Sequence, residues 1–242
     1  MSTWFPDGAL DWLAPTTPGR VLDVSATRML ASLLSIRDLA VFWAQPSPDA
    51  SPVPGATTVA ATANALPFDP GQFDTVTCHQ SLHTFTPDLA LGQIARVLRP
   101  TGVFSVSYLV RDDSVPWVRR LIALVRRLDP QAMSGDYGST TVRFLHASRY
   151  FPDIDQRQFR VWRPITKSGL VDMVLSQPLA RRLDEDAISR LVDDVEELYR
   201  DSARPAEDLM LPFKLTCWRA QVSHDELTTP VARQEPGLRI QL

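Results

Sequence analysis

The strongest constraint on the fold is the order in which short apolar segments alternate with helix-like segments. Residues 21–24 are apolar around one acid, residues 27–34 place apolar side chains on one side of a helix, and residues 39–44 are apolar again. Further strand-like segments follow at 57–61, 73–78, 102–108, 159–162 and 210–221, and helix-like segments at 88–98, 114–128, 166–175 and 184–199. This order predicts an α/β fold, in which helices cover both faces of a mostly parallel sheet.

The length of the chain, 242 residues, suits one large α/β domain, which we expect to span residues 1–222. Residues 129–156 show no clear period, and we expect an irregular cap or lid there. Residues 223–242 are polar and contain two prolines, so we expect a disordered tail.

Charge and composition limit the binding partners and the cellular compartment that we expect for this protein. The formal net charge of −3 gives no basic excess for nucleic acid. The chain has no run of 18 apolar residues to span a membrane, and its first residues lack the basic start and apolar core of a secretory signal. The two cysteines and four scattered histidines indicate a cytoplasmic protein without a metal site. The sequence leaves open whether the protein forms a homodimer.

Several segments resemble the class I S-adenosylmethionine-dependent methyltransferases. Residues 20–24 look like the first strand of that family, and residues 94–102 are very close to its helix-to-fifth-strand segment. Residues 64–68 and 73–76 resemble its third-strand exit and fourth strand. Further segments are similar to an actinobacterial-type subgroup of the type 11-like methyltransferases, at 111–118, 164–166, 169–170, 211–213 and 217–219. The resemblance covers roughly residues 5–221 and implies a three-layer, Rossmann-like sheet of seven mostly parallel strands.

The resemblance also implies a site for S-adenosylmethionine beyond the carboxyl ends of the strands. The residues that match its positions are Asp23 at the end of the first strand, Ser25 and Ala26 after that strand, Gln45 after the second, Thr62, Ala63 and Asn64 after the third, and His79 and Gln80 after the fourth. His83 follows them and is the candidate general base, because an imidazole exchanges protons near neutral pH. A structural, hydrogen-bonded role for His83 stays open.

The chain departs from the family where the cofactor loop belongs. The family follows its first strand with a GxGxG loop, whose small residues let the backbone approach the cofactor. Here no glycine lies between Gly19 and Gly55, and Gln45 stands where the family has a ribose-binding acid.

These departures leave the question of enzymatic activity open between several hypotheses. The first is methyl transfer from S-adenosylmethionine to a small-molecule acceptor. The second is a pseudo-methyltransferase that has lost cofactor binding and serves as a binding or regulatory protein partner. A remodelled cleft for a different ligand is the third.

Overall fold

The computed structural model describes residues 5–47, 51–130, 137–204 and 207–228. Its strands are β1 (Gly19–Asp23), β2 (Leu39–Gln45), β3 (Ala56–Ala60), β4 (Phe73–His79), β5 (Leu98–Arg111), β6 (Asp153–Ile165) and β7 (Leu209–Gln221). Its helices are α1 (Asp7–Leu13), α2 (Met29–Leu34), α3 (Pro87–Val97), α4 (Pro116–Arg126), α5 (Tyr137–His146), α6 (Lys167–Leu175), α7 (Glu185–Ser202) and α8 (Asp225–Thr228). Two short 3₁₀ helices complete the described elements, η1 (Leu82–Thr84) and η2 (Pro178–Arg182).

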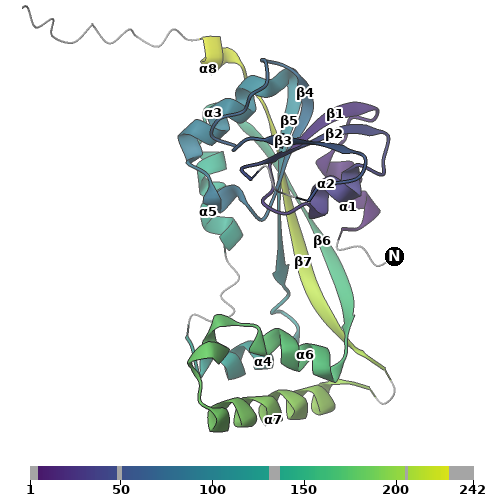
Figure 1. The fold of residues 1–242 in the computed structure, drawn as a ribbon, viewed down its shortest axis with the longest axis vertical. Helices are drawn as coiled ribbons and strands as arrows, with labels where there is room; N and C mark the ends of the chain where they lie inside the picture. The colour runs from purple at the N-terminus through teal and green to yellow at the C-terminus, as the bar shows by residue number, and fades with distance from the viewer. Residues whose placement is uncertain (1–4, 48–50, 131–136, 205–206, 229–242) are drawn as a thin grey trace, which may run out of the picture. The chain divides into compact units, whose positions relative to one another are not determined.

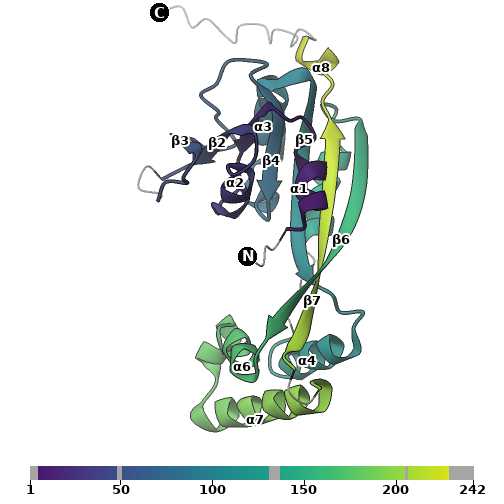
Figure 2. The same cartoon turned by 90° about the vertical axis from the view of Figure 1, so that its right-hand side faces the viewer.

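The seven strands form one sheet in the order β3-β2-β1-β4-β5-β7-β6. Neighbours from β3 to β5 pair in parallel. Strand β7 runs antiparallel to β5: the backbone N–H of Val222 donates to the carbonyl of Gly102 near the start of β5, whereas the N–H of Asp112, just past the end of β5, donates to the carbonyl of Pro212. Figure 2 shows the opposite directions of these two arrows. The prediction of a seven-stranded, mostly parallel α/β sheet is therefore confirmed.

The described residues divide into two compact units. We call the described parts of 7–107, 139–157 and 217–242 the sheet unit, and those of 1–6, 108–138 and 158–216 the helical unit. In the sheet unit, α1 and α2 lie on one side of the strands and α3 and α5 on the other (Figure 1). Its central strand β4 is buried over nearly its whole length, because helices cover both faces of a parallel sheet. The sequence-based prediction of one domain over residues 1–222 stays a prediction.

The helical unit has a hydrophobic core of its own. Within the helix predicted at 114–128, Val118, Leu121 and Val125 form a buried apolar stripe along α4. It belongs to a cluster with Leu170 of α6 and Leu191 of α7. Burying such a stripe against other helices is what stabilises an amphipathic helix.

Three local features add to what the sequence indicated. In the helix expected at 88–98, Leu89 is exposed, and Ala90, Leu91 and Ile94 form the buried stripe. The segment 129–156 was expected to be irregular, yet it contains α5 and the start of β6. In the predicted tail, α8 is a short helix, and residues 229–242 lie outside the described residues.

Candidate cofactor site at the carboxyl edge of the sheet

The parallel register brings three of the predicted site residues to one edge of the sheet. Asp23, Gln45 and His79 are the last residues of β1, β2 and β4. Strand β1 lies between the other two strands, so its last residue has neighbours on both sides. Asp23 stands in register with Trp43 of β2 and with Thr77 of β4. Ligands of open α/β sheets bind outside this carboxyl edge.

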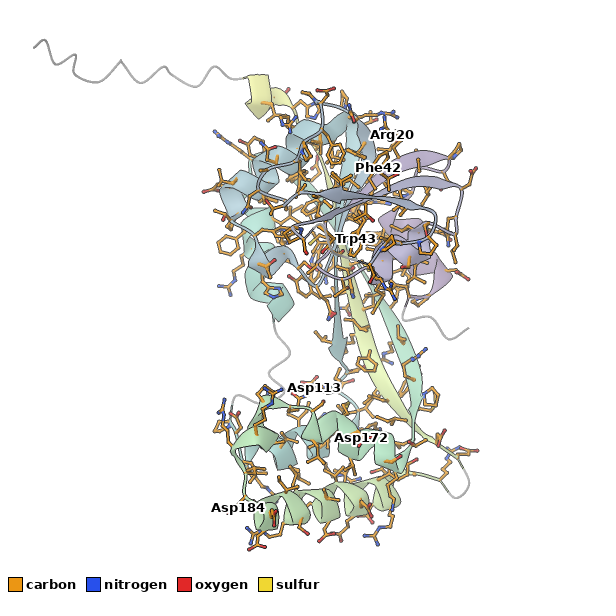
Figure 3. The ribbon with its side chains drawn as sticks, viewed as in Figure 1. Arg20, Phe42, Trp43, Asp113, Asp172 and Asp184 are labelled. Atoms are coloured by element: carbon orange, nitrogen blue, oxygen red, sulfur yellow. The ribbon has the colours of Figure 1, made fainter. Side chains whose placement is uncertain are left out.

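Ser25 connects all of these strand ends through hydrogen bonds. Its Oγ donates to Asp23 Oδ1 over 2.5 Å and accepts the His79 backbone N–H over 2.7 Å. Its carbonyl oxygen accepts from Trp43 Nε1 over 3.1 Å and from Gln45 Nε2 over 2.6 Å. Ser25 therefore contacts Asp23, Trp43, Gln45 and His79. Figure 3 labels Trp43 within the sheet unit. Hydrogen bonds thus hold the turn after β1, where the family uses glycines.

Ser81, the residue before η1, holds the next part of this turn. The backbone N–H of Ala26 donates to Ser81 Oγ over 2.8 Å, and that hydroxyl donates to the carbonyl of His79 over 2.9 Å. The Ser25 side chain is buried, whereas residues 26–28 are exposed. The side chain at position 25 therefore fills space inside the sheet edge.

Asp23 is a fully buried carboxyl group with no cationic partner among the described residues. Burial raises its pKa from the usual 3.8 to about 6, although hydrogen bonds with Ser25, Thr77 and the Ala31 backbone lower it in part. Its Oδ2 accepts no hydrogen bond of ordinary geometry from the described residues. A buried acceptor without a donor is costly unless another group supplies one.

His79 is held as a neutral imidazole. Burial lowers its pKa to about 4, although a contact with Ser107 opposes the change. Its Nδ1 lies 3.0 Å from Ser107 Oγ. Gln80, the next residue, has a φ of 50°, and its backbone N–H donates to the Ser107 carbonyl over 2.9 Å. At neutral pH the His79 ring is therefore a hydrogen-bonding group.

The predicted adenine-side residues form a separate turn after β3. The backbone of Thr62 pairs with Ala65, and Ala63 is buried beneath this turn. The Asn64 amide accepts the Thr86 backbone N–H over 3.2 Å and donates to Thr86 Oγ1 over 3.3 Å. Asn64 thus binds the residue that precedes α3. A role for these three residues in cofactor binding stays a prediction.

His83 lies in η1 and is exposed, so its catalytic role stays a prediction. Sequence reasoning missed four residues that bind the predicted ones, namely Trp43, Thr77, Ser81 and Ser107. Strand alternation could have found Trp43, because it lies two residues before Gln45 and shares its side of β2. Among the described residues no group of acids, histidines and cysteines could hold a metal ion, and no helix is long and apolar enough to cross a membrane.

Comparison with known proteins finds similarity to methyltransferases. A sequence profile described as a methyltransferase domain matches residues 34–106. A curated relative from Mycobacterium tuberculosis strain H37Rv, described as an uncharacterized methyltransferase, is 29% identical over 227 residues, which is 90% of each chain. The chain is therefore similar to methyltransferases over most of its length, and the profile match lies in its first half. The matched segment begins only after the turn at residues 24–28, where the family's glycine loop would lie.

Solved structures agree with the methyltransferase fold. A protein from Anaeromyxobacter dehalogenans, described as a proposed type II methyltransferase, has a TM-score of 0.68 at 19% identity and covers 91% of this chain and 98% of its own. A proposed methyltransferase from an antibiotic biosynthesis pathway of Anabaena variabilis has a TM-score of 0.56 at 15% identity, with 89% and 99% covered. At these identities the likeness supports the fold alone.

Proposed function

We propose that the protein binds S-adenosylmethionine at the carboxyl edge of β1, β2 and β4 and transfers its methyl group to a small-molecule acceptor. The observation that carries the proposal is the buried Asp23 carboxylate: among the described residues, its Oδ2 accepts no hydrogen bond of ordinary geometry and no cation lies beside it. The cofactor has an ammonium group, which matches a carboxylate that lacks a positive partner. When bound, the cofactor supplies an electrophilic methyl group.

The residues at this edge fit the donors of the cofactor. Asp23 would hold the ammonium group, and Gln45 would accept from the ribose through Oε1, since both of its donated hydrogen bonds use Nε2. Asp23 is enclosed, so a direct contact requires the exposed turn of residues 26–28 to move. That movement would break the bond from Ala26 to Ser81.

Methyl transfer depends mainly on bringing the acceptor atom in line with the methyl carbon. Only an acceptor that must lose a proton needs a base. His79 is a poor base near pH 7 because its pKa is about 4. The exposed His83 is our candidate for that task. His83→Gln should then slow turnover without weakening cofactor binding.

Calorimetric titration of the full chain with S-adenosylmethionine and S-adenosylhomocysteine tests the proposal. We expect saturable binding of both that Asp23→Asn weakens by about tenfold or more, since a charged hydrogen bond is lost. The exposed Asp153 has no such role, so Asp153→Asn should bind like the wild type. Affinity should also fall as the pH drops below about 6, where Asp23 gains a proton. Absence of heat at millimolar ligand would overturn the proposal.

A pseudo-methyltransferase that acts as a binding or regulatory partner is the second candidate. The observation that favours it is the closure of the turn after β1 by its own hydrogen bonds. The test is a variant in which residues 24–28 are replaced by a GxGxG loop and Gln45 by Asp. Binding by the variant alone would favour the pseudo-methyltransferase, whereas tight binding by the wild type would exclude it.

A further inference from the structure

A second polar site lies at the opposite, amino edge of the same sheet. A cavity of about 550 Å³ opens beside the first residues of β1 and β2, and its charged lining consists of Arg20, Arg37, Asp38, Asp74 and Arg99. Its volume falls within the range of roughly 300–1,000 Å³ that is common for small-molecule sites. Strand β1 has five residues, so at about 3.3 Å per residue this cavity lies about 13 Å from the Asp23 edge.

Two of the three guanidinium groups already have carboxylate partners. Arg99 Nη1 lies 2.5 Å from Asp74 Oδ1, and the other oxygen of Asp74 accepts the Arg20 backbone N–H over 2.8 Å. Arg37 forms ion pairs with Asp11 and Asp7. The carboxylate of Asp74 is therefore fully engaged, and Arg37 is neutralised from α1.

The guanidinium of Arg20 is different, because aromatic rings hold it. Its central carbon lies 5.3 Å from the centre of the Phe42 ring and 5.6 Å from that of Phe73 (Figure 3). These rings pack edge to face with each other and with Phe68, so the platform is fixed. Stacking fixes the guanidinium, yet no described residue accepts a hydrogen bond from its side-chain N–H groups.

We propose that this cavity binds a small molecule through an oxyanion, a phosphate or a carboxylate, that Arg20 holds. An arginine fork matches two oxygens of such a group. The ion pairs of Arg37 and Arg99 occupy those two guanidinium groups, whereas among the described residues no carboxylate forms an ion pair with Arg20, so its charge is available to an anionic ligand. The stacked side chain also loses less conformational freedom when a ligand binds, because its orientation is already set. The site is separate from the proposed cofactor site.

Titration of the full chain at constant ionic strength, with inorganic phosphate and with citrate, tests this proposal. We expect saturable binding of at least one probe, and the preferred probe tells phosphate from carboxylate recognition. Arg20→Met should weaken that binding by about tenfold or more. Arg20→Lys keeps the positive charge but loses the two-pronged guanidinium, so it should weaken binding less than Arg20→Met does. It also provides the test if Arg20→Met folds poorly.

Arg190→Met is the matched control, because Arg190 is an exposed arginine of α7. It should leave both titrations unchanged. Binding of neither probe beyond chloride, or equal weakening in Arg190→Met and in the Arg20 variants, would overturn the proposal. The S-adenosylhomocysteine titration of Arg20→Met should match that of the wild type, so failure of the cofactor proposal can be told apart from failure of this one.

Discussion

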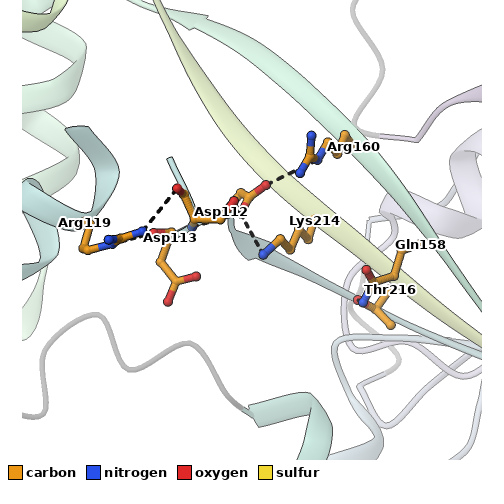
Figure 4. A network of polar contacts seen from close by, with 8 residues as sticks. Asp112, Asp113, Arg119, Gln158, Arg160, Lys214 and Thr216 are labelled. Atoms are coloured by element: carbon orange, nitrogen blue, oxygen red, sulfur yellow. Dashed lines mark hydrogen bonds and ion pairs between the residues drawn. The ribbon is translucent and has the colours of Figure 1, made fainter. Parts of the chain in front are cut away.

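Two aspartates at the ends of strands are both fully buried but have different surroundings: Asp23 is the last residue of β1, and Asp112 directly follows β5. Asp112 has a cation within 2.8 Å, the Nζ of Lys214, and a second at 3.6 Å, the Nε of Arg160 (Figure 4). It also accepts hydrogen bonds from the hydroxyl and the backbone of Ser114. Within the described part of the chain, Asp23 has hydroxyl and backbone donors but no cation.

The difference in surroundings decides the pH at which each of these two aspartates loses its proton. Burial alone raises the pKa of both aspartates. For Asp112, the contacts with Lys214 and Ser114 outweigh burial and lower its pKa below 3.8. For Asp23, burial prevails, and its pKa is about 6. A buried carboxylate with its own cation fixes structure, whereas one without a cation has capacity for a positive ligand.

The largest expected effect comes from removing the cation of Asp112. Lys214→Met leaves a buried carboxylate without its nearest positive charge and should lower the free energy of unfolding by about 3 kcal/mol at pH 7. Because the pKa of Asp112 lies below 3.8, its contribution is present above that pH and is lost as the pH falls. The difference between variant and wild type should therefore shrink in acid.

Urea unfolding at pH 7 and pH 3 measures this effect. Arg160→Met is the matched control, since the Arg160 side chain is 68% exposed and should contribute at most about 1 kcal/mol. Equal losses of unfolding free energy in Lys214→Met and Arg160→Met would contradict the larger contribution that we expect from Lys214.

The next effect concerns the pH dependence that Asp23 creates. Its pKa is higher in the folded protein, so its contribution to stability is present below pH 3.8 and is lost as the pH rises through about 6. That change is worth about 3 kcal/mol. Asp23→Asn removes the titration, and the stability of the variant relative to the wild type should rise between pH 4 and pH 7. Parallel unfolding profiles of the two proteins would refute the assignment.

A smaller effect is expected from Ser25→Ala. The substitution removes the acceptor of the buried His79 N–H and the shortest donor to Asp23, so it should lower stability by about 2 kcal/mol. It should also raise the pKa of Asp23, because the Ser25 hydroxyl favours the carboxylate. Thr27→Ala changes an exposed residue of the same turn and should have little effect on thermal or urea unfolding. Similar losses of stability in Ser25→Ala and Thr27→Ala would contradict the stabilising role that we assign to the Ser25 hydroxyl.

The smallest effect is expected from Thr77→Val. Thr77 Oγ1 donates to Asp23 Oδ1 over 3.1 Å, the longer of the two hydroxyl contacts of that carboxylate. Its loss should lower stability by about 1 kcal/mol at pH 7. Urea unfolding measures this loss of stability as well. A larger loss in Thr77→Val than in Ser25→Ala would contradict the expected order of the two effects.

Much of the fold could be predicted from the chain, because it follows from local patterns. The apolar segments around Val21, Val41 and Val76 are buried parallel strands, and Thr166 caps α6 by accepting the Gly169 N–H. The site could be predicted only in part. The pattern placed Asp23, Gln45 and His79 at the same edge, but it did not show that Gln45 turns toward the Ser25 carbonyl.

The sequence by itself determined the order of strands and helices, the resemblance to methyltransferases and the absence of a glycine loop, because periodicity and residue identity are local properties. The tertiary structure decided which aspartate has a cation, how Ser25 links the strand ends through hydrogen bonds, and that Arg20 lies on aromatic rings beside a cavity. Those outcomes depend on residues such as Lys214, which contacts Asp112 from about a hundred positions away in the chain. Only the folded chain brings such groups within hydrogen-bonding distance, and there burial and charge set their chemistry.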